Sequence, residues 1–294
     1  MRRFVFSILI LMSCGVSTVA QELEDDPTTH HKAWKAYFVK VANSYSITPD
    51  RKGAKAYEVT PNPIHSYYNS GGGEYNHGTF FFWLENGQPS AIGQLWSYGR
   101  TAGGSANVVH EMHSLTGEPF VAKLPGRGTA FWRPRKGGLD FKTLSKTIAA
   151  PKTTRGIRLA QMRSIAREFV AIVHRRTGME ELRMQQQPLF RYEPNPNRKH
   201  VVDGAVFAFF SSWDPEVILV LEAVKEGDMS YWRYSGVRLC NMPVSLKRAD
   251  KEVWRVEEAP FRGGQVNGPN DPYFARHGVD RVDPKSLPTE TDTN

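Results

Sequence analysis

The densest group of reactive side chains in the sequence lies between Asn107 and Ser114, in the run Asn-Val-Val-His-Glu-Met-His-Ser. This run favours a β-strand, in which successive side chains point to opposite faces of a sheet. Glu111 and His113 are then expected on one face and His110 on the other. Because imidazoles and carboxylates bind zinc and transfer protons, Glu111 and His110 are candidate catalytic residues.

Two more histidines of the same half, His65 and His77, fall on predicted strands that could approach this run. Together with His110, Glu111 and His113 they would supply enough ligands for a zinc ion. The spacing differs from that of the zinc-protease helix, in which two histidines flank the glutamate four residues apart. The alternative interpretation is a polar strand whose histidines are simply hydrogen-bonded.

A second candidate site is basic. Arg133, Arg135 and Lys136 open a segment rich in Lys and Arg, and such a segment could bind a ligand by its charge, for example an acidic glycan or an anionic surface. A solvated linker is the alternative interpretation. A protein partner would also fit this surface.

The N-terminus predicts export. Residues 1–20 combine two arginines, an apolar run and small residues ending at Ala20, which is the layout of a secretory signal peptide. The apolar run is shorter than the roughly 20 residues that span a bilayer, and no later segment is apolar enough for a transmembrane span. We expect a secreted or periplasmic protein, cleaved near Ala20, for which nucleic acid is an unsuitable partner.

Cleavage there leaves 36 basic and 30 acidic residues, a net charge of +6. Cys240 becomes the only cysteine, so that no intrachain disulfide can form and the fold depends on its core.

The mature sequence contains an internal repeat. Landmark residues recur in the same order at offsets of 122 to 126 positions: Pro63 and Pro188, Gly78 and Gly204, Pro89 and Pro215, Pro119 and Pro243, Trp132 and Trp254. Ahead of the first landmark of each half lies an amphipathic helical pattern, from Trp34 to Tyr45 and from Leu159 to Val173. The sequence therefore predicts an α+β fold made by tandem duplication of a helix plus an antiparallel β-meander, with mostly antiparallel sheet.

Strands such as Val217 to Leu221 lack polar alternation, so both of their faces are expected to be buried. The predicted organisation is a signal peptide at 1–20, a first α+β repeat at 21–133, a basic linker at 134–155, a second α+β repeat at 156–261 and a disordered tail at 262–294. The cluster between Asn107 and Ser114 has no counterpart in the second repeat, because the equivalent residues include no His or Glu.

The chain resembles uncharacterised secreted proteins of planctomycete-type bacteria. The resemblance is carried by five runs: 110–115 (His-Glu-Met-His-Ser-Leu), 161–163 (Gln-Met-Arg), 188–192 (Pro-Leu-Phe-Arg-Tyr), 203–209 (Asp-Gly-Ala-Val-Phe-Ala-Phe) and 214–217 (Asp-Pro-Glu-Val). It covers most of the mature chain and implies export and a shared fold. It implies no activity, cofactor or catalytic residue.

Two functions follow from the sequence, and whether the protein is an enzyme stays open. The first is a non-catalytic exported protein that binds a ligand or partner between its two halves and needs no cofactor. The second is a metal-dependent hydrolase with zinc at His110, Glu111 and His113.

Overall fold

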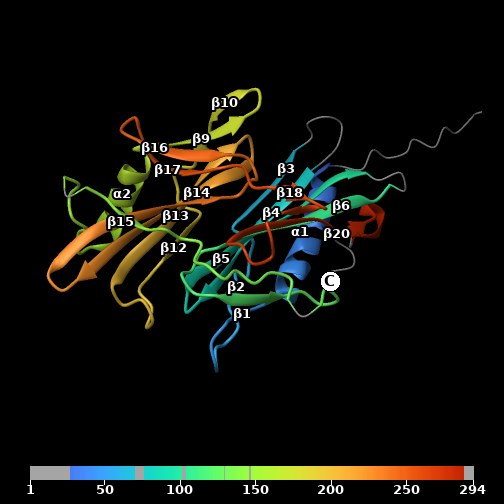
Figure 1. Cartoon of the computed structure of the whole chain (residues 1–294), viewed down its shortest axis with the longest axis horizontal. Coiled ribbons are helices and arrows are strands. Elements are labelled where there is room, and N and C mark those ends of the chain that lie inside the picture. The colour runs from blue at the N-terminus through green and yellow to red at the C-terminus, as the bar shows by residue number, and fades with distance from the viewer. Residues whose placement is uncertain (1–26, 70–75, 101–103, 129, 146, 288–294) are drawn as a thin grey trace, which may run out of the picture.

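The computed structural model describes residues 27–69, 76–100, 104–128, 130–145 and 147–287. The predicted signal peptide lies outside these ranges. The described chain has two α-helices and is otherwise mostly antiparallel sheet, which confirms the expected mostly antiparallel architecture. Figure 1 shows two halves side by side, each with its own helix. No helix within the described ranges is long and apolar enough to cross a bilayer.

The first half begins with helix α1 (Pro27–Ser44). Its strands are β1 (Ser46–Pro49), β2 (Glu58–Val59), β3 (His65–Asn69), β4 (Asn76–Glu85), β5 (Gln88–Arg100), β6 (Ala106–Ser114) and β7 (Phe120–Lys123), joined by the C-terminal β18 (Phe261–Arg262), β19 (Gln265–Val266) and β20 (Tyr273–Val282), before a short 3-10 helix at Pro284–Ser286. In the described residues these form an eight-stranded sheet in the order β18-β19-β20-β6-β5-β4-β2, with β3 also on β4, and a separate β1-β7 pair.

The second half is built around helix α2 (Arg155–Ala166). Its strands are β8 (Lys142–Thr143), β9 (Phe169–Arg175), β10 (Gly178–Glu181), β11 (Arg183–Met184), β12 (Phe190–Tyr192), β13 (Val201–Ser211), β14 (Asp214–Glu226), β15 (Met229–Arg238), β16 (Val244–Arg248) and β17 (Lys251–Val256). They form a six-stranded sheet in the order β11-β13-β14-β15-β8, with β12 also on β13, and a four-stranded sheet in the order β10-β9-β16-β17.

The eight-stranded and six-stranded sheets pack face to face. One apolar cluster contains Phe80 and Phe82 of β4 together with Ile218 and Val220 of β14. The alternate residues of the same strands pack the other way, towards the helix of their own half, as Phe81 does in the first half. The expectation that strands such as β14 are buried on both faces is confirmed, and its physical reason is this stack of layers.

Each helix packs on the outer face of its sheet. In α1, Trp34, Phe38 and Ala42 are spaced four apart and fully buried against the eight-stranded sheet, as an amphipathic helix requires. The second helix is shorter than predicted: it ends at Ala166, and the residues up to Val173 belong to β9. The β-branched residues of that segment favour a strand, and most of the segment is buried.

The prediction of a disordered tail at 262–294 is wrong for the described residues up to 287. Strand β20 pairs with β6 along most of its length, for example Tyr273 with His113, and Phe274 enters the core of the first half. The surrounding Gly, Pro and Asn residues concealed this strand in the sequence, although Tyr273 and Phe274 supply its aromatic anchors. The C-terminal segment thus returns to the first half and lies beside the candidate site.

Candidate functional site

The side chains of the polar strand β6 point alternately to the two faces of the sheet, as predicted. The Tyr45 hydroxyl of the first half lies 2.6 Å from Nδ1 of His110 on the helix side of the sheet. On the opposite face, the hydroxyl of Tyr273 donates a 2.5 Å hydrogen bond to Oε1 of Glu111, and the ring of His113 packs 6.0 Å from the same tyrosine ring. Burial lowers the pKa of His110 to about 3 and of His113 to about 4, so that both are neutral at physiological pH.

The proposed zinc ligands do not converge, and this corrects the hypothesis of a single centre. His65 donates from Nε2 to the carbonyl oxygen of Trp213, 3.1 Å away. His77 lies on the helix side, where its ring stacks on that of His31 at 5.7 Å. Strand alternation places His77 on the opposite face from Glu111, and strands β4 and β5 lie between His65 on β3 and Glu111 on β6. Among the described residues, no group of three or more His, Cys, Asp and Glu could hold a metal ion.

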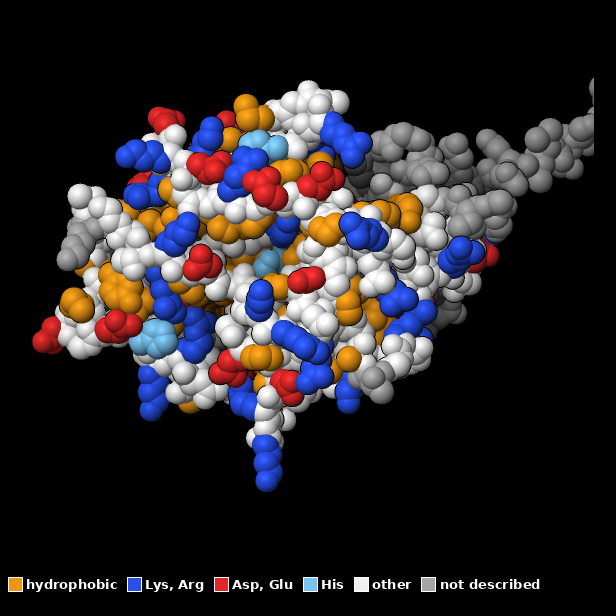
Figure 2. All heavy atoms as spheres, in the orientation of Figure 1, with side chains coloured by type: hydrophobic (Ala, Val, Ile, Leu, Met, Phe, Trp, Pro, Cys, Tyr) orange, Lys and Arg blue, Asp and Glu red, His pale blue; other side chains and the backbone are white. Residues whose placement is uncertain are grey.

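The predicted basic site is exposed at the edge of the first half. Arg133, Arg135 and Lys136 all face solvent, and Arg133 forms a 2.8 Å ion pair with Asp50. Figure 2 shows one face of the molecule, on which Lys and Arg side chains are spread over both halves with Asp and Glu among them. Binding of an acidic glycan or anionic surface by these three residues stays a prediction.

Polar side chains gather at the two ends of the interface between the sheets. Strand β14 passes through this interface, and its alternate residues point into it because side chains repeat every second position. Asp214 and Glu216 lie at one end, apolar residues lie in the middle, and Glu222 lies at the other end. A cavity is present at each end, lined by residues of both halves.

The cavity beside β6 has a volume of about 390 Å³, within the range of small-molecule sites. Its lining includes Glu111 from the first half and Asp214 and Glu216 from the second. We call it the carboxyl pocket, after these three groups. Strand β6, the first residues of β14 and the C-terminal strand β20 therefore form one site from segments far apart in the sequence.

Burial raises the pKa values of all three carboxyl groups. It raises the pKa of Glu111 to about 8, although the hydrogen bond from Tyr273 acts in the opposite direction. Burial also raises the pKa of Asp214 well above its usual range, and the nearby Glu216 and Glu111 add to the effect by repulsion. The pKa of Glu216 is raised as well, chiefly by burial. Like charges that share a poorly solvated site disfavour ionisation of one another.

Two arginines, Arg238 and Arg175, lie near these carboxyl groups. Arg238 is a buried guanidinium whose charge acts to lower the pKa of Glu111, and its nitrogens donate to the carbonyl oxygens of Cys240, Glu257 and Met242 at 2.6 to 2.8 Å. Glu216 forms an ion pair with Arg175, with a distance of 3.5 Å between the charged atoms. The carboxyl pocket therefore holds more acidic groups than nearby basic groups can neutralise.

The remaining lining is aromatic and apolar. Trp96 and Phe261 both contact the ring of His277, with centroid distances of 5.7 Å and 5.0 Å, and all three residues line the cavity. Gln94 lies behind them: its Nε2 donates to Oδ1 of Asp214 at 2.9 Å, while its buried Oε1 has no partner. Such a lining can surround the apolar body of a ligand whose polar end reaches the carboxyl groups.

Cys240 also lines this cavity. The thiol is free and buried, and burial together with Glu216 raises its pKa. A thiol in this state is a poor nucleophile.

No family model, no curated protein and no solved structure matches this chain. The site must therefore be interpreted from its own chemistry. Sequence reasoning found Glu111 but missed Asp214 and Glu216. A usable signal was present, since Asp214, Glu216 and Glu222 place acidic groups two or six residues apart on an otherwise apolar strand, and such groups on a strand buried on both faces need an explanation.

Proposed function

We propose that this is an exported, non-catalytic binding protein whose carboxyl pocket holds the cationic group of a small organic ligand. The observation that carries the proposal is the set Glu111, Asp214 and Glu216 around one cavity, with their pKa values raised. A bound ammonium group would stabilise the ionised carboxylates by direct hydrogen bonds and charge. Export rests on residues 1–20 and on the resemblance to secreted bacterial proteins.

The shape of the cavity supports an amine with an aromatic or apolar body. Trp96, Phe261 and His277 provide ring faces and edges on which such a body can pack, and a cation near an indole ring gains further electrostatic stabilisation. Cys240 and His113, with their shifted pKa values, are not suited to nucleophilic or acid catalysis at neutral pH. Glu111, with a pKa of about 8, could still donate a proton as a general acid. The binding role is proposed on the excess of carboxyl groups around the cavity.

We also propose that the two halves arose by tandem duplication. Strands β4 and β5 pair Phe82 with Ile92, and strands β13 and β14 pair Ala208 with Ile218, so both partners are displaced by 126 positions. The register of the strand pair β1-β7 likewise matches that of the pair β9-β16, with both strands displaced by 124 positions. Equal registers in separate sheets are what two copies of one unit would produce.

A close packing detail supports the same proposal. A Cβ atom on Gly78 would lie 2.2 Å from the ring of Tyr67, and a Cβ atom on Gly204 would lie 2.2 Å from the ring of Tyr192. Each glycine thus leaves room for a tyrosine from the neighbouring strand. The two glycine positions differ by 126 residues and the two tyrosine positions by 125.

Binding of an amine is tested with tyramine and with tyrosol, which replaces the amine by a hydroxyl group and keeps the ring. For a Kd of about 1 mM, tyramine at about ten times that concentration should raise the midpoint of thermal unfolding by about 2 to 4 °C. Tyrosol should give no comparable shift, because it carries no positive charge. Differential scanning fluorimetry near pH 8 measures both.

The variants Glu111→Gln and Asp214→Asn should abolish the tyramine shift while the protein still unfolds cooperatively. Glu226→Gln is the matched control, since Glu226 lies on the same strand β14 but is exposed. Equal shifts with tyramine and tyrosol, or a tyramine shift that survives both pocket variants, would exclude the carboxyl pocket as an amine site.

A further inference from the structure

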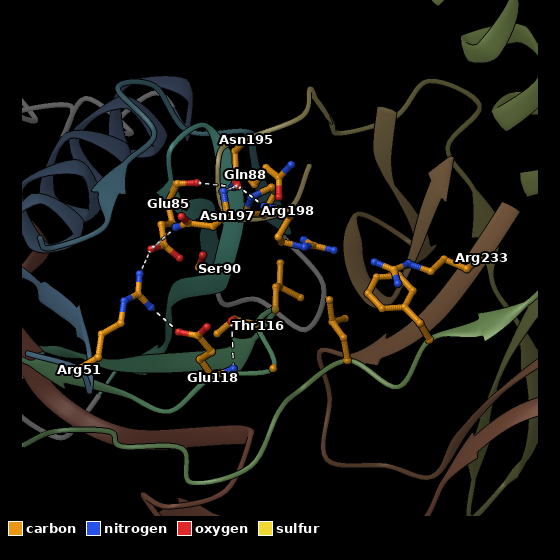
Figure 3. Close-up of a pocket in the computed structure, with 15 residues that line it drawn as sticks. Arg51, Glu85, Gln88, Ser90, Thr116, Glu118, Asn195, Asn197, Arg198 and Arg233 are labelled. Atoms are coloured by element: carbon orange, nitrogen blue, oxygen red, sulfur yellow. Dashed lines mark hydrogen bonds and ion pairs between the residues drawn. The ribbon is translucent and has the colours of Figure 1, made fainter. Parts of the chain in front are cut away.

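The second interface cavity lies at the opposite end of the sheet stack and has a volume of about 520 Å³. Figure 3 shows its lining, which comes from the turn between β4 and β5, the segment after β6, the loop before β13 and strand β15. We call it the arginine pocket, after Arg51, Arg198 and Arg233. None of the candidate catalytic, metal or ligand-binding residues named from the sequence lines it.

Every guanidinium group of the arginine pocket is already ion-paired. Arg51 bridges Glu85 and Glu118. On the other side, Arg198 and Arg233 both bind the fully buried carboxylate of Glu222, at 2.5 Å and 2.6 Å. Three positive and three negative groups balance one another, so the pocket offers no net charge to a ligand. A charged ligand would have to break one of these pairs.

The neutral polar groups of the same pocket include an acceptor without a partner. Gln88 is 2 % exposed; its Nε2 donates to the carbonyl oxygen of Glu193 at 2.7 Å, which fixes the amide, and its Oε1 is unpartnered. Figure 3 shows Gln88 in the lining with Ser90 and Thr116 close by. A buried amide oxygen without a partner favours a ligand that donates a hydrogen bond.

An apolar surface completes the lining. Phe141 and Leu139 of the segment between the halves lie beside Leu115 of the first half, and the guanidinium of Arg233 stacks on the Phe141 ring at 4.3 Å. The flat guanidinium, the ring and the leucines can contact the C–H face of a compact ring-shaped ligand. Hydroxyl groups on its rim would meet Gln88, Ser90 and Thr116.

From this arrangement we infer that the arginine pocket is a second ligand site, which binds a neutral saccharide unit. Its charge is balanced, its free buried acceptor is an amide, and its apolar wall suits a sugar ring. Asp214 and Glu216 lie 126 positions after Gln88 and Ser90, the offset of the repeat. The two pockets therefore occupy corresponding positions in the two halves. The corresponding positions hold neutral groups at one end and carboxyl groups at the other, and the two ends therefore select different ligands.

Saturation-transfer NMR tests the inference with a mixture of glucose, galactose, mannose, N-acetylglucosamine and cellobiose at millimolar concentration, and separately with galacturonate. At least one neutral sugar should receive saturation from the protein. Gln88→Leu should weaken that sugar's binding about tenfold, the effect of one lost hydrogen bond. Gln186→Leu is the matched control, because Gln186 is exposed and lies outside the pocket.

A second variant keeps the test valid if Gln88→Leu impairs folding. Gly117 lines the same pocket, and a Cβ atom added to it meets no atom within 4 Å, so Gly117→Trp should fold and obstruct the cavity. Transfer to no neutral sugar, transfer to galacturonate alone, or neutral-sugar binding unchanged in Gly117→Trp would overturn the inference. Each of these results is independent of tyramine binding in the carboxyl pocket.

Discussion

Replacement of Glu222 by glutamine is expected to lower the free energy of unfolding by about 3 to 5 kcal/mol, the range for a broken buried ion pair. Glu222 is fully buried and accepts hydrogen bonds from Arg198 at 2.5 Å, Arg233 at 2.7 Å and the Tyr192 hydroxyl at 2.8 Å. Its loss leaves two guanidinium groups without an anion. Because these arginines also shape the arginine pocket, sugar binding should fall with stability.

Chemical denaturation at neutral pH measures this change. Glu226→Gln serves as control: it removes the same charge from the exposed end of β14, and we expect less than about 0.5 kcal/mol of change, as at most surface positions. A loss below about 1 kcal/mol in Glu222→Gln would mean that the two arginines find other partners or solvent, and that the balanced charge of the pocket is not fixed by Glu222.

Local pattern was enough to predict most elements of the two halves, but not the C-terminal strand β20. The turn at Asn86 and Gly87, both with positive φ, joins two apolar runs as a hairpin, and the unbroken apolar face pattern of β14 correctly predicted burial on both sides. The end of α2 was misplaced, since a short apolar run such as Phe169 to Val173 satisfies both a helical and a strand pattern. Pairing with β10 and β16 decides in favour of the strand.

The candidate site was predictable only in part, for a geometric reason. Glu111 was identified from its neighbours along the strand, but Asp214 reaches the same cavity from a different sheet, 103 positions later in the sequence. The Tyr273 hydroxyl that binds Glu111 belongs to a segment expected to be disordered. Spacing along one strand says which face a residue occupies, but it does not say which sheet covers that face.

The second large effect is the pH dependence of stability caused by Glu111. Its pKa is about 8 in the folded protein, raised from 4.5 by burial, so the folded state retains a proton that the unfolded state releases. A raised pKa stabilises the folded state fully below pH 4.5, and this contribution is lost as the pH rises towards 8. Since one pKa unit corresponds to about 1.4 kcal/mol, the total loss is on the order of 4 to 5 kcal/mol.

Glu111→Gln cannot ionise and keeps an oxygen that accepts the hydrogen bond from Tyr273. We therefore expect equal stability of variant and wild type near pH 4, and a variant more stable by roughly 3 to 5 kcal/mol near pH 9. Urea unfolding of both proteins between these limits gives the difference directly. Burial also lowers the pKa values of His110 and His113, which weakens both proteins alike in acid and so cancels in the comparison.

Glu226→Gln provides the reference for removal of an exposed carboxylate, and its stability should follow that of wild type across the same range. A difference between Glu111→Gln and wild type that does not change with pH would mean that Glu111 is ionised in the folded protein at neutral pH. The carboxyl pocket would then already contain a compensating positive charge, and an amine ligand would have no unneutralised partner in it. The same titration therefore tests both the acidity of Glu111 and the charge of the ligand proposed for this site.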